Sequence, residues 1–368
     1  SGGVDSTLLA TFLDPEHRLL TVVPDTPEFS IETDYARQSA HLLNMSLEEM
    51  TIPEDSYVEL LETVIDNTGR PPVHDIVPFL AAPYAANAGG LFLVGEGADG
   101  IYGTGGRAAK VANLLRQRHL RAAALGLVRR APDRISIRGE MIVSRGAEFA
   151  TDPLGPGGFA ATSQVYGDPS FITDIVGMDR IESTLLSDLS IVLDRVDLAT
   201  PKDQFLQHIE LGSWRDAFAD HIRIDREAAR VHGAEVRAPF TMAPAITALT
   251  RVPMADRCIR GYTGKWMMKE MLTKRLPEYP VGRQKQHTSL PFTRYCTNGP
   301  LTGIWDRYTP PDIFQGQARQ DLIANKLDEA VLWNAIAFAM WDERVVHNPG
   351  LAARTSNFRV SVEPSNTV

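Results

Sequence analysis

Short apolar runs alternate with helical patterns along the first part of the chain. Residues 19–23 form a β-branched apolar run that ends at a proline, which predicts a buried strand, and residues 91–94 form a second such run before a glycine. Apolar side chains recur at helical spacing over residues 7–13, 32–43 and 60–65, which predicts three helices. This alternation predicts an α/β fold with a doubly wound parallel sheet. In such sheets, ligands bind beyond the carboxyl ends of the strands.

The rest of the chain divides into two parts. Residues 104–160 are rich in arginine and alanine and close on a glycine and proline cluster, which predicts a basic helical insertion followed by a mobile loop. A solvated basic face is the ordinary interpretation, and a docking site for an acidic partner or leader peptide is the alternative. Residues 161–368 are predicted to be a mainly helical continuation of the domain that starts with residues 1–103. Its predicted helices include 181–197, 203–219, 264–276 and 327–343.

Composition supports one large core or two fused lobes, since 43% of the 368 residues are hydrophobic. A net charge of -9 argues against a nucleic-acid partner, because nucleic-acid phosphates are bound through lysine and arginine. The two cysteines form neither a disulfide framework nor a metal site, and no apolar stretch approaches the roughly 20 residues that cross a bilayer. Since no signal peptide is visible either, we expect a cytoplasmic protein without a membrane segment. The chain opens inside a strand-to-helix turn, so we expect a processed product or a piece of a longer protein.

The opening motif Ser-Gly-Gly-Val-Asp-Ser suits an anion-binding turn. Gly2 and Gly3 allow the backbone to turn tightly and point successive N–H groups at an anion. The hydroxyls of Ser1 and Ser6 add donors, and a helix that begins there adds its positive end. Asp5 would disfavour a phosphate unless it binds Mg²⁺, a cation that prefers oxygen ligands. An ordinary glycine turn is the alternative.

A second glycine-rich motif, Gly95-Glu96-Gly97-Ala98-Asp99, follows the strand over residues 91–94. Two acids three residues apart at the carboxyl end of a strand can face one ligand. One can then bind Mg²⁺ while the other accepts a proton. A glycine-rich turn with solvated acids is the alternative.

Four motifs in the same order resemble the asparagine synthetase family. The two glycine-rich motifs are followed by an Asp-Arg … Glu-x-Arg-x-Pro-Phe stretch and a Lys … Leu-Pro … Arg-x-Lys run. The matching residues of these last two are Asp225-Arg226, Glu235-Val236-Arg237-Ala238-Pro239-Phe240, Lys265-Trp266, Leu276-Pro277 and Arg283-Gln284-Lys285. The resemblance covers roughly residues 1–103 and 205–345, and the family includes β-lactam synthetases and lasso-peptide macrolactam synthetases.

The resemblance implies an ATP-pyrophosphatase fold, of the adenine nucleotide α-hydrolase-like type, with a large helical part. It also implies a role for each matched residue. Asp5 and Asp99 would bind Mg²⁺. Glu96 would assist the incoming amine, and Lys285 would stabilise charge during adenylation and amide formation. The residues that would bind ATP are Ser1, Gly2, Gly3, Asp5, Ser6, Gly95 and Gly97.

The acids of the third motif are interpreted differently. Asp225 and Glu235 are expected to be structural acids paired with Arg226 or Arg237, because buried acids often form such pairs. We do not assign them a catalytic role.

The reaction that the resemblance implies has two steps. A carboxylate attacks the α-phosphate of Mg·ATP to give an acyl-adenylate and pyrophosphate, and an amine then displaces AMP. Because the mixed anhydride is sensitive to water, a closing segment is expected, and residues 103–158 are the candidate.

Departures from the family pattern bear on the substrate. Gly100 stands where the family usually has an acid, and Thr241-Met242 stands where it usually has Leu-Asp, which casts doubt on aspartate. We also expect the family's N-terminal glutaminase domain to be absent, so that ammonia would come from solution or from a separate glutaminase-like chain, and a peptide-binding partner is a further possibility. One alternative is an intramolecular amide synthetase, which makes a β-lactam or a peptide macrolactam from a small-molecule or peptide carboxylate. Another is a catalytically silent binding subunit.

Overall fold

The structure is a computed structural model that describes most of the first 102 residues and most of the chain between residues 222 and 348. The described residues are 1–26, 29–72, 74–102, 222–249, 251–252, 254–261, 263–283 and 290–348. The predicted helices over 181–197 and 203–219, the basic insertion over 104–160 and Lys285 lie outside them. The proposed division into domains therefore stays a prediction.

Helices and strands alternate in the first part of the chain, as the hydrophobic pattern predicts. The elements are α1 (Val4–Ala10), β1 (Leu19–Pro24), α2 (Ser30–Leu43), β2 (Leu47–Ile52), η2 (Glu54–Ser56), α3 (Tyr57–Thr68), α4 (Val77–Ala86), β3 (Leu91–Leu93) and α5 (Ala98–Tyr102). The first helix starts three residues earlier than predicted. Asp5 and Ser6 therefore lie in the first turn of a helix and not in the loop before it.

The described chain after residue 221 is mainly helical. Its elements are α13 (Ile222–Val231), β4 (Glu235–Arg237), η5 (Pro239–Thr241), α14 (Ala243–Leu249), α15 (Met254–Cys258), β5 (Ile259–Arg260), β6 (Thr263–Gly264), α16 (Trp266–Arg275), α17 (Phe292–Asn298), α18 (Ile304–Arg307), α19 (Gly316–Ile323), α20 (Glu329–Trp341) and the π-helical η6 (Asp342–His347). The predictions over 264–276 and 327–343 correspond to α16 and α20.

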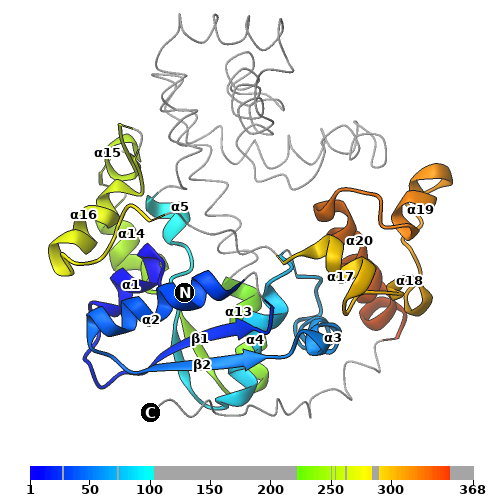
Figure 1. Cartoon of the computed structure of the whole chain (residues 1–368), viewed down its shortest axis with the longest axis horizontal. Helices are drawn as coiled ribbons and strands as arrows, with labels where there is room; N and C mark the ends of the chain where they lie inside the picture. Colours follow the sequence, from blue (N-terminus) through cyan, green and yellow to red (C-terminus); the bar gives the residue numbers. More distant parts are fainter. Residues whose placement is uncertain are drawn as a thin grey trace, which may run out of the picture.

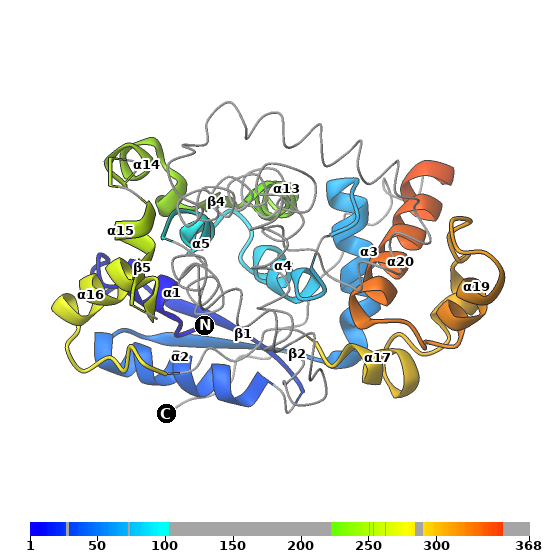
Figure 2. The ribbon, with the colours of Figure 1, turned by 90° about the horizontal axis from the view of Figure 1, so that it is seen from above.

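The longer strands pair in parallel, which confirms the predicted sheet in part. Leu19 of β1 lies opposite Leu47 of β2, and Leu91 of β3 lies opposite Glu235 of β4. Among the described residues these are separate two-stranded sheets, and β5 with β6 forms a short antiparallel pair. Helix α2 packs on β1 and β2, and α4 packs on β1 from the other side (Figure 2).

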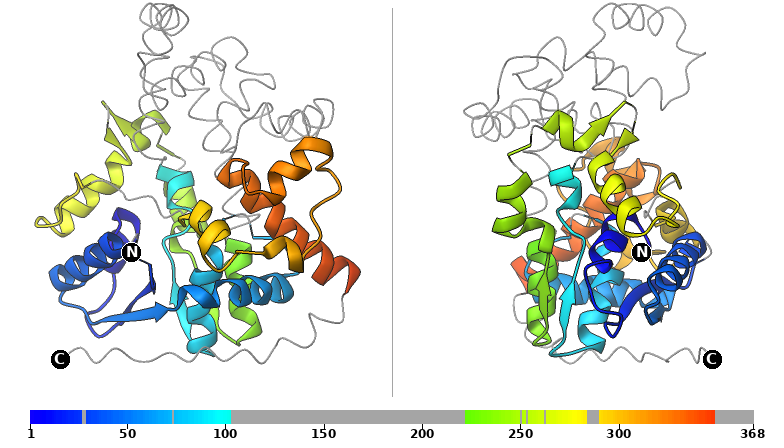
Figure 3. Two further views of the ribbon diagram at one scale, coloured as in Figure 1. Left: turned by 45° about the vertical axis from the view of Figure 1, so that its right-hand side comes forward. Right: turned by 90° about the vertical axis from the view of Figure 1, so that its left-hand side faces the viewer.

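Two hydrophobic cores lie toward opposite ends of the molecule (Figure 1). The first, which we call the α1–α16 core, packs α1, α5 and α16 around side chains that include Leu8, Met268 and Leu272. The second, the α3–α20 core, joins α3 to α17, α18 and α20 around residues such as Tyr57 and Ile336. Figure 3 shows the C-terminal helices grouped away from the helices that surround the N-terminus.

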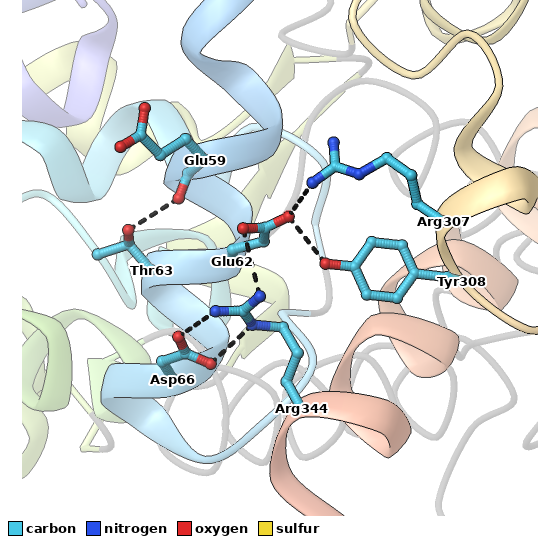
Figure 4. Close-up of polar contacts among 7 residues, drawn as sticks. All are labelled: Glu59, Glu62, Thr63, Asp66, Arg307, Tyr308 and Arg344. Carbon is cyan, nitrogen blue, oxygen red and sulfur yellow. Dashed lines mark hydrogen bonds and ion pairs between the residues drawn. The ribbon is translucent and has the colours of Figure 1, made fainter. Parts of the chain in front are cut away.

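Helix α3 shows why the second core forms where it does. Leu60, Leu61, Val64 and Ile65 recur at helical spacing and are all buried, as the sequence pattern predicts. Acidic residues on the same helix make ion pairs with the C-terminal elements. We call these acids and their partners the Arg344 cluster, which consists of Glu62, Asp66, Arg307, Tyr308 and Arg344 (Figure 4). The cluster ties α3 to α18 and η6.

Candidate active site

The opening motif forms a tight turn that leads directly into α1. Gly3 is the N-cap of the helix. Its backbone N–H donates a hydrogen bond to the hydroxyl oxygen of Ser1, with 3.4 Å between the nitrogen and the oxygen. The hydroxyl oxygens of Ser1 and Ser6 are 3.1 Å apart. Backbone N–H groups and hydroxyls thus gather at the start of a helix, the arrangement that binds phosphate groups in many proteins.

Gly2 is required by both its conformation and its neighbours. Its φ is +63°, in the left-handed region, and a Cβ there would lie 2.3 Å from the backbone of Tyr35 in α2. The carbonyl oxygen of Gly2 accepts hydrogen bonds from the hydroxyls of Tyr279 (2.8 Å) and Ser39 (3.4 Å). The turn is therefore held against α2 and against the segment after α16.

The second glycine-rich motif lies directly against the first. A Cβ on Gly95 would lie 3.4 Å from Cβ of Asp5 and from the backbone nitrogen of Ser6. Gly97 has a φ of +80°, and a Cβ there would lie only 2.1 Å from Cγ2 of Thr241. The structure thus brings together two motifs that are about ninety residues apart in the sequence.

Lys265 joins the two predicted metal-binding acids. Its Nζ lies 2.6 Å from Oδ2 of Asp5 and also pairs with Oδ1 of Asp99. Only 11% of the lysine side chain is exposed. Burial alone would lower the pKa of Lys265, but Asp5 and Asp99 outweigh it and raise the pKa above its ordinary value. We call these three residues the Lys265 cluster.

The backbone at Lys265 also marks it as a special position. The residue caps the N-terminus of α16 with φ +52°, in the left-handed region, which is uncommon for a residue with a side chain. Lys265 is the lysine of the Lys … Leu-Pro run, a motif that by itself predicts no role for it. Its place in that run is the one signal in the sequence that could have marked Lys265 as a site residue, because the lysine is far from both acids along the chain.

A family model described as asparagine synthase matches residues 1–343. The chain belongs to this family. A comparison with curated proteins finds no match. The match of the family model confirms the family predicted from the sequence. Membership in the family supports ATP-dependent amidation in a general sense, with ATP, a carboxylate and an amine as substrates. Among the described residues, no helix is long and apolar enough to cross a membrane.

The two acids of the Lys265 cluster fit the Mg²⁺ ion that such chemistry usually uses. Asp5 and Asp99 supply the carboxylate oxygens that Mg²⁺ prefers. Within the described residues there is no group of three or more His, Cys, Asp or Glu side chains that could hold a metal. A Mg²⁺ ion would therefore need ligands from substrate phosphates and water as well, as it commonly does at phosphoryl sites.

The partners of Asp225 are not the predicted arginines, Arg226 or Arg237. It lies partly buried on α13, where the hydroxyl of Tyr84 is its hydrogen-bond partner and Glu96 is a nearby negative charge. Burial, reinforced by Glu96, raises the pKa of Asp225 to about 8, although the Tyr84 hydrogen bond opposes the shift. Asp225 thus lies beside the predicted catalytic acid.

Glu235 pairs with Arg237 as predicted, but the prediction that it is buried is wrong. Its Oε1 accepts a hydrogen bond from Nε of Arg237 at 2.6 Å, on β4. The pair lies on the surface and is not buried, because 60% of the Glu235 side chain is exposed.

The predicted catalytic lysine, Lys285, lies outside the described residues, but Arg283 just before it is described. The Arg283 guanidinium stacks on the rings of Tyr35 and Tyr279, at 4.4 and 4.3 Å from their centroids. Its Nη2 donates to the hydroxyl of Ser39 at 3.1 Å, and Ser39 in turn donates to the carbonyl of Gly2. The chain therefore enters the Lys285 segment beside the opening turn.

Proposed function

We propose that this protein joins a carboxylate to an amine through an acyl-adenylate and releases AMP and pyrophosphate. The observation that carries the proposal is the convergence of the opening turn, Asp99 and Lys265 at one place. A turn rich in N–H and hydroxyl donors, two carboxylates and one buried cation together suit the triphosphate of ATP and its metal.

In the first step, an oxygen of the substrate carboxylate attacks the α-phosphorus of ATP. The bond between the α-phosphorus and its bridging oxygen breaks, and pyrophosphate leaves with that electron pair. The N–H of Gly3 and the ammonium of Lys265 would stabilise the charge that develops on the departing phosphates. Held by Asp5 and Asp99, Mg²⁺ would neutralise further phosphate charge. Lys285 is proposed to add a positive charge at this step and the next.

In the second step, the amine nitrogen attacks the acyl carbon, the bond from that carbon to the AMP oxygen breaks, and the nitrogen loses a proton. Glu96 is proposed to accept this proton. Because the pKa of the neighbouring Asp225 is raised to about 8, Asp225 holds a proton at neutral pH. Asp225 then adds no negative charge beside Glu96, the proposed proton acceptor.

A contact at the second motif favours a carboxylate other than aspartate. Thr241, one of the departures from the family pattern, packs its methyl group against Gly97. The departure therefore lies against the acidic motif itself and not at a distant surface. This supports the second candidate, an intramolecular synthetase that closes a β-lactam or a peptide macrolactam.

The test is the release of AMP and pyrophosphate from Mg·ATP, with ammonium present, against aspartate, other amino-diacids and peptides. We expect release with one class of carboxylate and its loss in Lys285→Ala. Lys274→Ala, which removes an exposed lysine at the end of α16, is the matched control and should keep the activity. Release of ADP and phosphate would contradict the adenylation mechanism. ATP binding without any turnover would support the silent subunit.

A further inference from the structure

Lys265 lies where a metal ion would have to bind. Its Nζ contacts one oxygen of Asp5 and one of Asp99, the two carboxylates that suit Mg²⁺. The amine therefore takes up one oxygen of each carboxylate, and a metal ion bound between the two acids would lie beside its positive charge. A cation already seated there also repels a second cation at short distance, and the repulsion is strong where water is partly excluded.

The lysine cannot leave the carboxylates without another anion to pair with. Its side chain is 11% exposed, so an unpaired ammonium in the same place would lose most of its hydration. Its backbone is held in the left-handed region at the start of α16, which fixes the direction in which the side chain leaves the chain. A ligand that supplies negative charge beside Nζ is needed to free the oxygens.

The triphosphate of ATP is such a ligand. We propose that Lys265 occupies the metal position in the nucleotide-free protein, so that the divalent metal binds only when phosphates take over the lysine. The inference rests on the proposed function for the identity of ATP as the ligand. Binding of metal and nucleotide is then positively coupled, and each increases the affinity of the other by the same factor.

The decisive measurement is Mn²⁺ binding, followed by the electron paramagnetic resonance of free Mn²⁺, with and without a non-hydrolysable ATP analogue. We expect wild-type protein to bind Mn²⁺ weakly when no nucleotide is present. Lys265→Met should bind Mn²⁺ without nucleotide at least about ten times more tightly, because the competing charge is gone. The same variant should bind the metal–nucleotide complex more weakly. A merely structural role for Lys265 would weaken both kinds of binding.

The control is Lys274→Met, which removes a lysine of the same helix that is exposed and has no part in the Lys265 cluster. It should match the wild type in both titrations. Tight binding of Mn²⁺ by the nucleotide-free wild type would overturn the inference. This measurement uses the wild type alone, so it can overturn the inference even if Lys265→Met fails to fold. Failure of the wild type to bind ATP with metal would instead contradict the proposed function.

Discussion

Lys265 and Arg344 each lie between two carboxylates, but only Lys265 lies at the candidate active site. Lys265 and Arg344 are equally buried, with 11% of each side chain exposed. Their carboxylates differ. The two in the Lys265 cluster are 23% and 45% exposed, whereas the two that pair with Arg344 are 17% and 0% exposed. The two clusters therefore differ in the exposure of their anions and not in the burial of their cations.

The geometry of the Arg344 cluster explains why it is structural (Figure 4). Nε and Nη2 of Arg344 bind both oxygens of Asp66, at 2.8 and 2.5 Å, and Nη1 lies 3.3 Å from Oε2 of Glu62. The other oxygen of Glu62 accepts hydrogen bonds from Arg307 and Tyr308. A guanidinium that binds a carboxylate in a bidentate way has a fixed orientation. The ammonium of a lysine is a point charge and can form an ion pair with a different anion.

The largest effect is expected from Arg344→Met. Loss of the guanidinium removes the positive charge that contacts both oxygens of the fully buried Asp66, which should lower the free energy of unfolding by about 3–5 kcal/mol. ATP affinity of the folded fraction should be unchanged, because the cluster lies in the α3–α20 part of the molecule. Urea denaturation and calorimetric titration with ATP measure the two quantities.

The control for this prediction is Arg307→Met, which removes a 54% exposed member of the same cluster. It should cost about 0–1 kcal/mol, as surface ion pairs do. If Arg344→Met weakened ATP binding as much as it lowered stability, the two clusters would not be independent and the comparison would fail.

The next effect is expected from Lys265→Met, with the opposite pattern. Because the lysine would stabilise phosphate charge, kcat/KM for AMP formation should fall by about 10²–10³-fold. Stability should change by about 1 kcal/mol or less, since the two carboxylates are partly hydrated without it and methionine keeps the same backbone. Lys274→Met should leave both quantities unchanged. A loss of stability as large as that of Arg344→Met would show that Lys265 is mainly structural.

Local patterns in the sequence predict the elements that carry them, whereas distant contacts do not show in it. The helical periodicity of the apolar residues in α3 and the β-branched run of β1 are each sufficient to predict the element. Strand β2 was missed because Glu48 and Glu49 break its apolar pattern, and its pairing with β1 depends on a distant segment. Helix α4 was missed because Pro83 lies inside it.

The site shows the same division. The order of motifs predicted that the opening turn and the Gly95–Asp99 segment act together, and the structure places them in contact. No short-range pattern indicates that Lys265 reaches both acids, because the packing of α16 on α1 brings it there. The environment of Asp225 was wrongly predicted for a similar reason, since Tyr84 and Glu96 come from other elements.

A pH titration should separate the two regions through two buried acids. The pKa of Asp225 in the folded protein, about 8, lies above the value near 4 of an unfolded chain, so the folded state holds the proton more tightly. Its stabilising contribution is complete below about pH 4 and is lost as the pH rises towards 8. Between about pH 6 and 7.5, wild type should lose roughly 2 kcal/mol of stability relative to Asp225→Asn.

Asp75, whose carboxylate accepts a hydrogen bond from the backbone of Leu290, is the matched acid near the α3–α20 core. Burial raises the pKa of Asp75 to about 6 although the Leu290 hydrogen bond opposes it, so its contribution is lost between about pH 4 and 6. Asp75→Asn should therefore track the wild type above about pH 6. Equal pH slopes for the two variants in that range would contradict the raised pKa of Asp225.

The smallest effect concerns two arginines that hold opposite ends of the opening region. Arg283 stacks beside the turn and donates to Ser39, whereas Arg275 donates to Thr11 at the end of α1 and lies 3.9 Å from the ring centroid of Phe12. Both arginines make a cation–π contact and hydrogen bonds, so their removal should lower the free energy of unfolding by similar amounts, about 1 kcal/mol each.

Of the two arginines, only Arg283 reaches the carbonyl of Gly2 through Ser39. Arg283→Met should therefore raise KM for ATP by about five- to tenfold, because a loosened turn loses the fixed arrangement of its donors. Arg275→Met should leave KM unchanged. Equal changes of KM in the two variants would mean that support of α1 as a whole, and not of the turn, sets the affinity for ATP.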